Sequence, residues 1–375
     1  MKWKIPLFKM YWDDEDVTLV NDAIRSGMSW AGGPKIAEFE EKIAAYIGSE
    51  YCLTFNSGTS ALHVVLLAHG IGKNDEVIVP SFTFIATANS PHFVGAKPVF
   101  ADIDEETFGL DPASVEEKIT KKTKAIMPVH YGGCPCRVRE LREIADDHGV
   151  LLIEDAAEAF GAKIGSQKVG SFGDSSMMSF CQNKIITTGE GGAILTDSRD
   201  LYERMKLIRS HGRLETADYF STTAVMDYID LGFNFRISNI TAALGIAQIN
   251  KVKKIITMRR KDAEYYNKNL AKAVPSPRCR LMEPPKGYHH VYQLYSVRVQ
   301  DRDALITHME KKKIMTKIYF SPVHKTHYYK NVLKYTDVLP VTDRIAGEII
   351  SLPFYPGITR EEMDAVISGI AAFYR

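Results

Sequence analysis

Short apolar runs alternate with amphipathic stretches between about residues 35 and 248. Residues 138–148 place their apolar side chains at helical spacing, with charged residues between them. Four other runs are rich in residues that favour strands, and each ends near proline, aspartate or glycine: residues 77–80, 97–101, 124–129 and 150–154. Strands that alternate with helices predict an α/β fold, in which helices flank a mostly parallel, mixed sheet.

The pattern changes after Gln248. A helix rich in lysine and arginine is predicted over residues 251–270, and a final helix over 360–373 follows Thr359, whose acidic successors are typical of a helix start. Between these helices the sequence predicts a proline-rich loop, a strand over 291–299, a helix over 302–313 and a short strand over 316–320. We therefore expect a larger domain over residues 1–250 and a smaller α+β domain over 251–375.

Composition favours a soluble globular protein. Of the 375 residues, 45% are hydrophobic and 25% are charged, which excludes low-complexity and disordered classes. A single core stops growing at roughly 250–300 residues, so the length agrees with two domains. The formal net charge of +1 gives no electrostatic reason to expect a nucleic-acid partner, and it does little to keep protomers apart.

Neither a membrane span nor an export signal is recognisable. No apolar run reaches the roughly 18 residues of a membrane helix, and acidic residues 13–16 come before any signal-peptide core could form. We therefore expect a cytoplasmic protein without a membrane partner. The five cysteines are too few for a disulfide scaffold, and Cys134 and Cys136 lack a second pair for a zinc site, so we expect free thiols and no metal.

The first motif with chemical content is NSGTSA at residues 56–61, between a predicted strand over 51–55 and a predicted helix over 60–69. Small residues at a helix start leave backbone N–H groups free to hold an anion, and the helix dipole adds to the attraction. An ordinary N-cap is the alternative, because serine and threonine cap many helices.

Two further motifs supply acids and a lysine. Glu154 and Asp155 directly follow an apolar strand, and a buried carboxylate is costly unless paired, so we expect one of them to meet a cation. Solvation at the strand end is the alternative. Lys184 lies between an apolar strand and a glycine-rich turn, where burial lowers the pKa of a lysine and makes it a nucleophile for carbonyls; an ordinary surface lysine is the alternative.

Together the three motifs place an anion cradle, an acid and a lysine on strand-end loops of one sheet, where the ligands of such sheets bind. Pyridoxal phosphate needs all three: a helix start for its phosphate, a lysine for its aldehyde, and a carboxylate that keeps its ring nitrogen protonated. A dinucleotide is less favoured, because the region before the sheet lacks G-x-G-x-x-G.

Several segments follow one another in a specific order along nearly the whole chain. They are NSGTSAL at 56–62, PSFTFIATANS at 80–90, MPVHYGG at 127–133, EDAAEAFG at 154–161, SFCQNKIITTGEGG at 179–192, GFNFRISNITAALG at 232–245 and SLPFYPG at 351–357. In these segments the chain resembles the DegT/StrS family of nucleotide-sugar aminotransferases, which have the type I fold of pyridoxal-phosphate transferases.

The resemblance implies roles for individual residues. Lys184 matches the lysine that bonds covalently to pyridoxal phosphate, and Asp155 matches the partner of the ring nitrogen. Further matches concern the phosphate, the ring face and the ring hydroxyl: Gly58, Thr59 and Ser179 for the phosphate, Phe84 for the ring face, and Glu158 for the hydroxyl.

The resemblance also implies an assembly. Asn234, with Arg236 beside it, matches a residue that the neighbouring subunit donates to the cofactor phosphate. The active sites would then be shared across a homodimer, and we expect residues 1–34 to pack elsewhere on that dimer.

The implied reaction moves the amino group of glutamate to a nucleotide-linked 4-keto-6-deoxy sugar in two half-reactions, for polysaccharide or glycan synthesis. Lys184 favours amine transfer, because a related dehydrating branch has histidine at this position. Residues 183–192 with Glu158 resemble GDP-perosamine synthases, whereas residues 128–138 are closer to enzymes for UDP-linked sugars, and a dTDP-linked sugar is also open. A pyridoxal-dependent dehydratase and a non-catalytic regulator with the same fold are the alternatives.

Two histidines in the segment SPVHKTHYY, His324 and His327, are candidates to contact the sugar or its pyrophosphate. Solvent-exposed loop histidines are the alternative.

Overall fold

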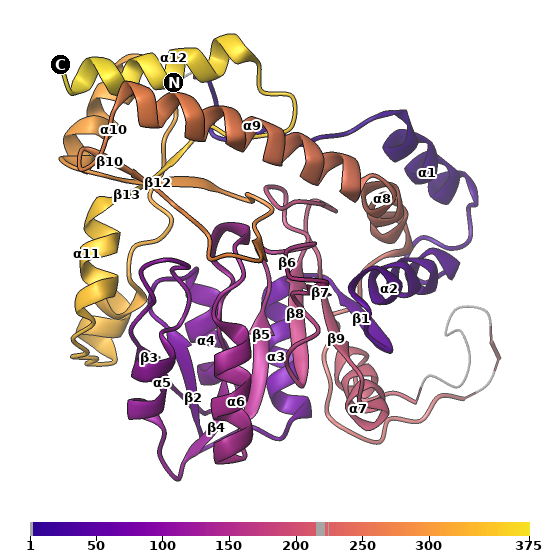
Figure 1. The fold of residues 1–375 in the computed structure, drawn as a ribbon. Helices are drawn as coiled ribbons and strands as arrows, with labels where there is room; N and C mark the ends of the chain where they lie inside the picture. The colour runs from indigo at the N-terminus through magenta and orange to yellow at the C-terminus, as the bar shows by residue number, and fades with distance from the viewer. Residues whose placement is uncertain (1–2, 215–221, 224) are drawn as a thin grey trace.

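A sheet of seven strands forms the centre of the fold in this computed structural model, which describes residues 3–214, 222–223 and 225–375 (Figure 1). The strand order is β1-β9-β8-β5-β4-β2-β3. The bounds are β1 (Tyr51–Phe55), β2 (Glu76–Pro80), β3 (Lys97–Ala101), β4 (Thr123–Ile126), β5 (Leu151–Asp155), β8 (Ser175–Ser179) and β9 (Gly192–Thr196). β9 runs opposite to both of its neighbours, and the other pairings are parallel, so the predicted mostly parallel sheet is confirmed.

Both faces of this sheet are buried. On β2, Val77 and Val79 pack into one core and Ile78 packs into another, as expected for strand side chains that alternate between faces. Helices cover the first face with α3 (Gly58–Ala68), α4 (Ile85–Phe93) and α7 (Arg199–Arg209), and the second with α2 (Pro34–Ile47), α5 (Pro112–Lys118), α6 (Val138–His148) and α8 (Asn239–Asn250). The predicted helix over residues 138–148 is confirmed at both ends.

Beyond α8 the chain forms a further core, in addition to those on the two faces of the large sheet. Three strands, β10 (Cys279–Leu281), β12 (Tyr295–Val299) and β13 (Ile349–Leu352), form a sheet in the described residues. They pack with α9 (Val252–Ala273), α10 (Arg302–Lys311) and α12 (Arg360–Phe373), and α11 (Pro340–Glu348) leads into β13. Figure 1 shows α9 running from α8 across to α12. The helix therefore contributes both to a core of the large sheet and to the core beyond α8.

Two strand predictions in this region need correction. The predicted strand over residues 291–299 is ladder-paired only from Tyr295 onward. The predicted strand over 316–320 is wrong, because the segment makes a single bridge, between Lys317 and Ser351. Beyond that bridge the chain turns its aromatic rings into a cluster, where Tyr319 accepts a hydrogen bond from Tyr131 through its carbonyl oxygen.

A third, small sheet lies beside α9. It consists of β6 (Lys163–Ile164), β7 (Gln167–Lys168) and β11 (Tyr288–His289), with β6 in the middle. Within the described ranges, no helix combines the length and the apolar character that crossing a membrane requires. Cys134 and Cys136 are buried free thiols, as expected.

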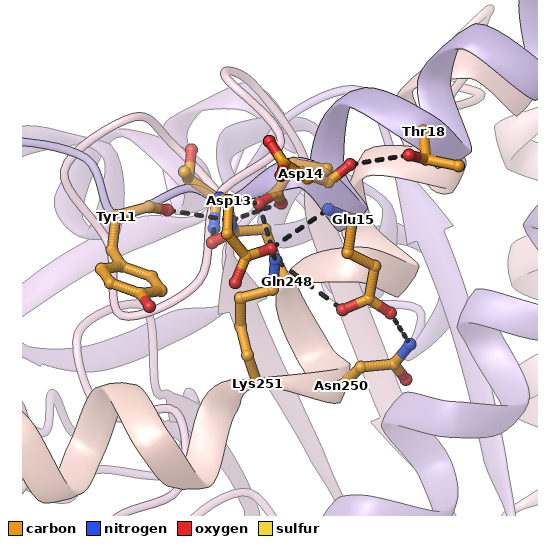
Figure 2. Close-up of polar contacts among 10 residues, drawn as sticks. Tyr11, Asp13, Asp14, Glu15, Thr18, Gln248, Asn250 and Lys251 are labelled. Carbon is orange, nitrogen blue, oxygen red and sulfur yellow. Dashed lines mark hydrogen bonds and ion pairs between the residues drawn. The ribbon is translucent and has the colours of Figure 1, made fainter.

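The N-terminal helix α1 (Asp14–Arg25) lies against α8 and is held by Lys251, which precedes α9 (Figure 2). The Lys251 ammonium donates to Asp13 and, at 2.6 Å, to Asp16, while Gln248 Nε2 donates to the other oxygen of Asp16 at 2.7 Å. Asp13 also caps α1, so one side chain both starts the helix and anchors it. The packing of residues 1–34 on a dimer stays a prediction.

Candidate active site

The carboxyl ends of β1, β2, β5 and β8 meet at one edge of the sheet, because these strands share one direction. Asp155 and Ser179 end β5 and β8. Gly58 begins the helix after β1, and Phe84 precedes the helix after β2. The fold thus brings to one edge four residues that the sequence places far apart.

The start of α3 forms a tight cradle. Ser57 is its N-cap and accepts a hydrogen bond from the Ser60 N–H at 3.0 Å, so the ordinary N-cap interpretation holds for Ser57. A Cβ on Gly192 would lie 2.6 Å from the Ser57 carbonyl oxygen, and one on Gly58 would lie 3.4 Å from Ser179 Oγ. Backbone therefore approaches Ser179 closely at a helix N-terminus, an arrangement that fits a phosphate. Thr59 is half-buried in the first turn.

Asp155 is 3% exposed. Its Oδ2 accepts a hydrogen bond from Thr87 Oγ1 at 2.7 Å, and its Oδ1 accepts one from the Ala157 N–H at 3.2 Å. Burial raises the pKa of Asp155 above its ordinary value, and the two hydrogen bonds and the Lys184 charge oppose that rise. A buried carboxylate held in this way fits the nitrogen of a pyridinium ring.

Lys184 approaches Glu158. The distance from Lys184 Nζ to Glu158 Oε1 is 3.6 Å, and the two side chains are 15% and 6% exposed. Glu158 is fixed in turn, because its Oε2 accepts a hydrogen bond from the Gly132 N–H at 2.8 Å. The ordinary surface-lysine interpretation is therefore wrong: the lysine lies beside Glu158, and its charge opposes the rise in the pKa of Asp155.

Glu154 has a structural role instead. Its carboxylate lies 3.0 Å from His130 Nε2 and accepts N–H bonds from the loop at residues 170–173. The Cys136 N–H donates to His130 Nδ1, so the ring proton is on Nε2 and points to Glu154. Both side chains are fully buried, and solvation at the strand end is wrong for Glu154.

Phe84 is 60% exposed, so the alternative of a core phenylalanine is wrong. Its ring lies 6.3 Å from that of Phe320, tilted by 55°. An exposed aromatic side chain at the edge where ligands bind is available to stack on a flat ring.

Asn234 and Arg236 lie beside the segment that leads into α3 of the same chain. Asn56 donates through its backbone N–H to the Phe235 carbonyl oxygen at 2.8 Å, and through Nδ2 to the Asn234 carbonyl oxygen at 3.4 Å. The Asn234 side chain is exposed and Arg236 is half-buried. Donation of Asn234 to a partner subunit stays a prediction.

His324 is 5% exposed, so the alternative of an exposed loop histidine is wrong for this residue, although His327 is exposed. Its Nδ1 lies 2.7 Å from Ser81 Oγ, just after β2, and its Nε2 lies 3.4 Å from Asp343 Oδ1. Burial lowers the pKa of His324, which favours the neutral ring at neutral pH. Contact of His324 with a substrate stays a prediction.

Sequence reasoning missed Thr87 and Gly192 as parts of this site. Thr87 is 68 positions from Asp155 and has no local signal, because its hydroxyl reaches the carboxylate only once α4 packs on the sheet. The double glycine at 191–192 was visible in the sequence, but its close approach to Ser57 depends on the pairing of β9 with β1.

Comparisons with known proteins agree with this geometry. Residues 11–371 match the model of the DegT/DnrJ/EryC1/StrS aminotransferase family. The chain is 36% identical over 373 residues to a GDP-perosamine synthase of Escherichia coli O157:H7, covering 99% of this chain and 98% of that one. It is 40% identical over 346 residues to a GDP-perosamine synthase of Caulobacter vibrioides, covering 90% of both.

A solved structure gives the same result for the fold. DesV of S. venezuelae, in complex with ketimine intermediate, matches with a TM-score of 0.90 and 30% identity over 99% of both chains. The cradle, the buried carboxylate and the lysine fit the phosphate, ring nitrogen and aldehyde of pyridoxal phosphate. The chain therefore belongs to the DegT/DnrJ/EryC1/StrS family of aminotransferases, which depend on this cofactor.

Proposed function

We propose that the protein transfers the amino group of glutamate to a GDP-linked 4-keto-6-deoxy sugar, as a GDP-perosamine synthase does. The observation that carries the proposal is the 3.6 Å approach of Lys184 Nζ to Glu158 Oε1, three residues after the buried Asp155 at the end of β5. A regulator that had lost catalysis would have no need of a half-buried lysine beside a buried acid. The similarity to two GDP-perosamine synthases supports the GDP-linked substrate.

Each residue has a part in this chemistry. Bound pyridoxal phosphate supplies a cationic ring that stabilises negative charge on the donor's α-carbon. Lys184 Nζ would take the proton from that carbon and pass it to the cofactor carbon that carried the aldehyde, and Asp155 would keep the proton on the ring nitrogen. The start of α3 and Ser179 hold the phosphate, Phe84 covers the ring face, and Glu158 fixes Lys184 near the ring hydroxyl.

The substrate is tested by a product screen. The holoenzyme is incubated with glutamate or glutamine and with GDP-, UDP- or dTDP-linked 4-keto-6-deoxy sugar, and products are identified by mass spectrometry. We expect an aminated GDP-sugar with glutamate and none with the Lys184→Ala variant. Amination of the UDP- or dTDP-linked sugar alone would change the nucleotide, and a deoxygenated product would identify a dehydratase. No product with any sugar, despite bound cofactor, would favour the regulator.

We also propose that the protein works in the cytoplasm as a homodimer with shared sites, without membrane or nucleic-acid partners. Apolar side chains just before Asn234 support the dimer, because Val225 is 99% exposed and Leu231 is 82% exposed. If a second copy of the chain covered these side chains, Asn234 would come close to the cofactor phosphate of that second copy. The near-zero net charge agrees with the absence of a nucleic-acid partner.

A further inference from the structure

A row of basic side chains crosses the small sheet beside α9. Lys163 on β6 is directly opposite Lys168 on β7 and directly opposite His289 on β11. Directly opposed residues of antiparallel strands project from the same face, and like charges in that position are destabilising. Lys168 shows the effect of this repulsion: burial lowers its pKa, and the charges of Lys163 and Lys253 lower it further.

Helix α9 adds cations to the same place. Lys253, Thr257, Arg260 and Lys261 recur at helical spacing and face the small sheet across a cavity of about 760 Å³. Arg260 Nη1 donates to the His290 carbonyl oxygen at 2.8 Å, which holds its guanidinium in place. The row on the sheet and the row on the helix are therefore the two walls of one groove.

The groove is lined by one carboxylate, that of Glu264, and by five side chains with a formal positive charge: Lys163, Lys168, Lys253, Arg260 and Lys261. Among the described residues, no carboxylate lies within ion-pair distance of any of these five cations. His289 Nδ1 is buried there, and no hydrogen-bond partner for it occurs in the part of the chain that the structure describes. Uncompensated cations gathered in a cavity favour a multiply charged anion.

None of the residues assigned to the cofactor lines this groove. Its volume lies in the range of small-molecule sites, roughly 300–1,000 Å³, and is larger than one phosphate requires. The Tyr46 ring in its wall already contacts Phe160, stacked at 5.2 Å, and Lys168, 4.8 Å from the ring centre, so recognition is assigned to charge rather than to stacking with a base.

We propose that this groove is a second anion site, which binds a diphosphate group through Lys163, Lys168 and the cations of α9. The group belongs either to a free nucleoside diphosphate or to inorganic pyrophosphate. The site is independent of amine transfer, since its residues are distinct from those around Lys184.

The test is titration calorimetry of the holoenzyme, whose own phosphate cradle is filled, with pyrophosphate and with ADP as probes. The double variant Lys163→Gln, Lys168→Gln removes the row on the sheet. Lys268→Gln, Lys272→Gln is the matched control, because it removes two exposed lysines of α9 that lie outside the groove. We expect the Kd of pyrophosphate to rise about tenfold or more in the groove variant and to stay unchanged in the control.

A second readout separates binding from a structural role. Without ligand, Lys163→Gln should raise the melting temperature, because it removes the repulsion between Lys163 and Lys168; a lysine that only supported the fold would lower it. Tighter binding of ADP than of pyrophosphate identifies a nucleotide as the source, and the reverse identifies the free anion. Equal binding by the groove variant and the control, or no binding of either probe at millimolar concentration, overturns the proposal.

Discussion

At the scale of single residues, the site depends on how Asp155 keeps a negative charge inside the protein. Burial favours the protonated acid, and the Thr87 hydroxyl opposes it by donating at 2.7 Å. Hydrogen bonds to charged groups contribute about 1.5–3 kcal/mol, so the loss of this one donor should raise the pKa of Asp155. Thr87 is therefore a positioning residue, one that acts on the reaction through Asp155.

Thr87→Val keeps the shape of the side chain and removes this donor. The pKa of Asp155, already raised by burial, should rise further. Because Asp155 loses its charge as the pH falls through its pKa, activity should be lost at a higher pH than in the wild type. A pH profile of kcat/KM measures this shift. Ser90→Ala is the control, because Ser90 Oγ donates to the Thr87 carbonyl oxygen and not to the carboxylate of Asp155. If the acidic side of the pH profile is unchanged in Thr87→Val, Thr87 does not act on the reaction through Asp155.

The glycine that meets the phosphate loop gives a second test at this scale. A Cβ on Gly192 would lie 2.6 Å from Ser57 O and 2.7 Å from Gly58 N, so Gly192→Ala must push the start of α3 outward. Overpacking of this kind costs about 1–3 kcal/mol, and cofactor affinity should fall about tenfold or more. Gly347→Ala is the control, since nothing lies within 4 Å of its added Cβ. Absorbance titration with the cofactor measures its affinity for both variants. Equal affinities would contradict the proposal that the start of α3 holds the cofactor phosphate.

At the scale of elements, α1 depends on one buried cation. Lys251 has a side chain that is 5% exposed and pairs with Asp13 (Figure 2) and also with Asp16. Removing one partner of a buried pair costs about 3–5 kcal/mol, because the remaining charges stay unpaired. Lys251→Met should therefore release α1 before the rest of the protein unfolds. Lys268→Met, an exposed change on α9, should not.

Tryptophan fluorescence reports this release, because all three tryptophans lie within the first 30 residues. In Lys251→Met the fluorescence transition in denaturant should precede the circular-dichroism transition, whereas in Lys268→Met the two should coincide. Acid should have a similar effect on the wild type. The hydrogen bond from Lys251 lowers the pKa of Asp13, so its contribution is present above about pH 4 and is lost as the pH falls through that lowered pKa. If the two transitions coincide in Lys251→Met, Lys251 does not anchor α1 to the rest of the protein.

How well each element could be predicted from the sequence depends on how local its causes are. The helix over 360–373 has both of its ends where they were predicted, because Thr359 and Glu362 form a capping box within one turn. β13 was missed, since its strand character comes from pairing with β12, more than fifty residues earlier. The role of Glu154 was missed for the same reason, because His130 and the loop at 170–173 become neighbours only in the fold. The division near residue 250 stays a prediction.

At the scale of the whole molecule, polar side chains join the large sheet and the core beyond α8 across the sheet edge. Asp102, just after β3, accepts hydrogen bonds from the Val341 N–H at 2.9 Å and from Thr342 Oγ1 at 2.7 Å, at the start of α11. Glu105 pairs with Arg298 on β12 and with Arg344 on α11. These contacts fix the core beyond α8 relative to the edge that carries Asp155 and Lys184. In a single chain the outer side of that edge stays exposed at Phe84.

A shared active site predicts complementation between two defective subunits. Lys184→Ala should abolish activity, and Asn234→Ala should lower it by weakening the hold on the partner's cofactor phosphate. When the two variants are co-expressed, a mixed dimer has one site with both changes and one site with neither. Random pairing makes half of the dimers mixed, so roughly a quarter of all sites are wild-type. Amine transfer per milligram should recover to about that fraction, above the mean of the two parents. If Asn234 instead serves the cofactor of its own chain, every site that keeps Lys184 in the mixture lacks Asn234, and activity should stay at the mean of the parents.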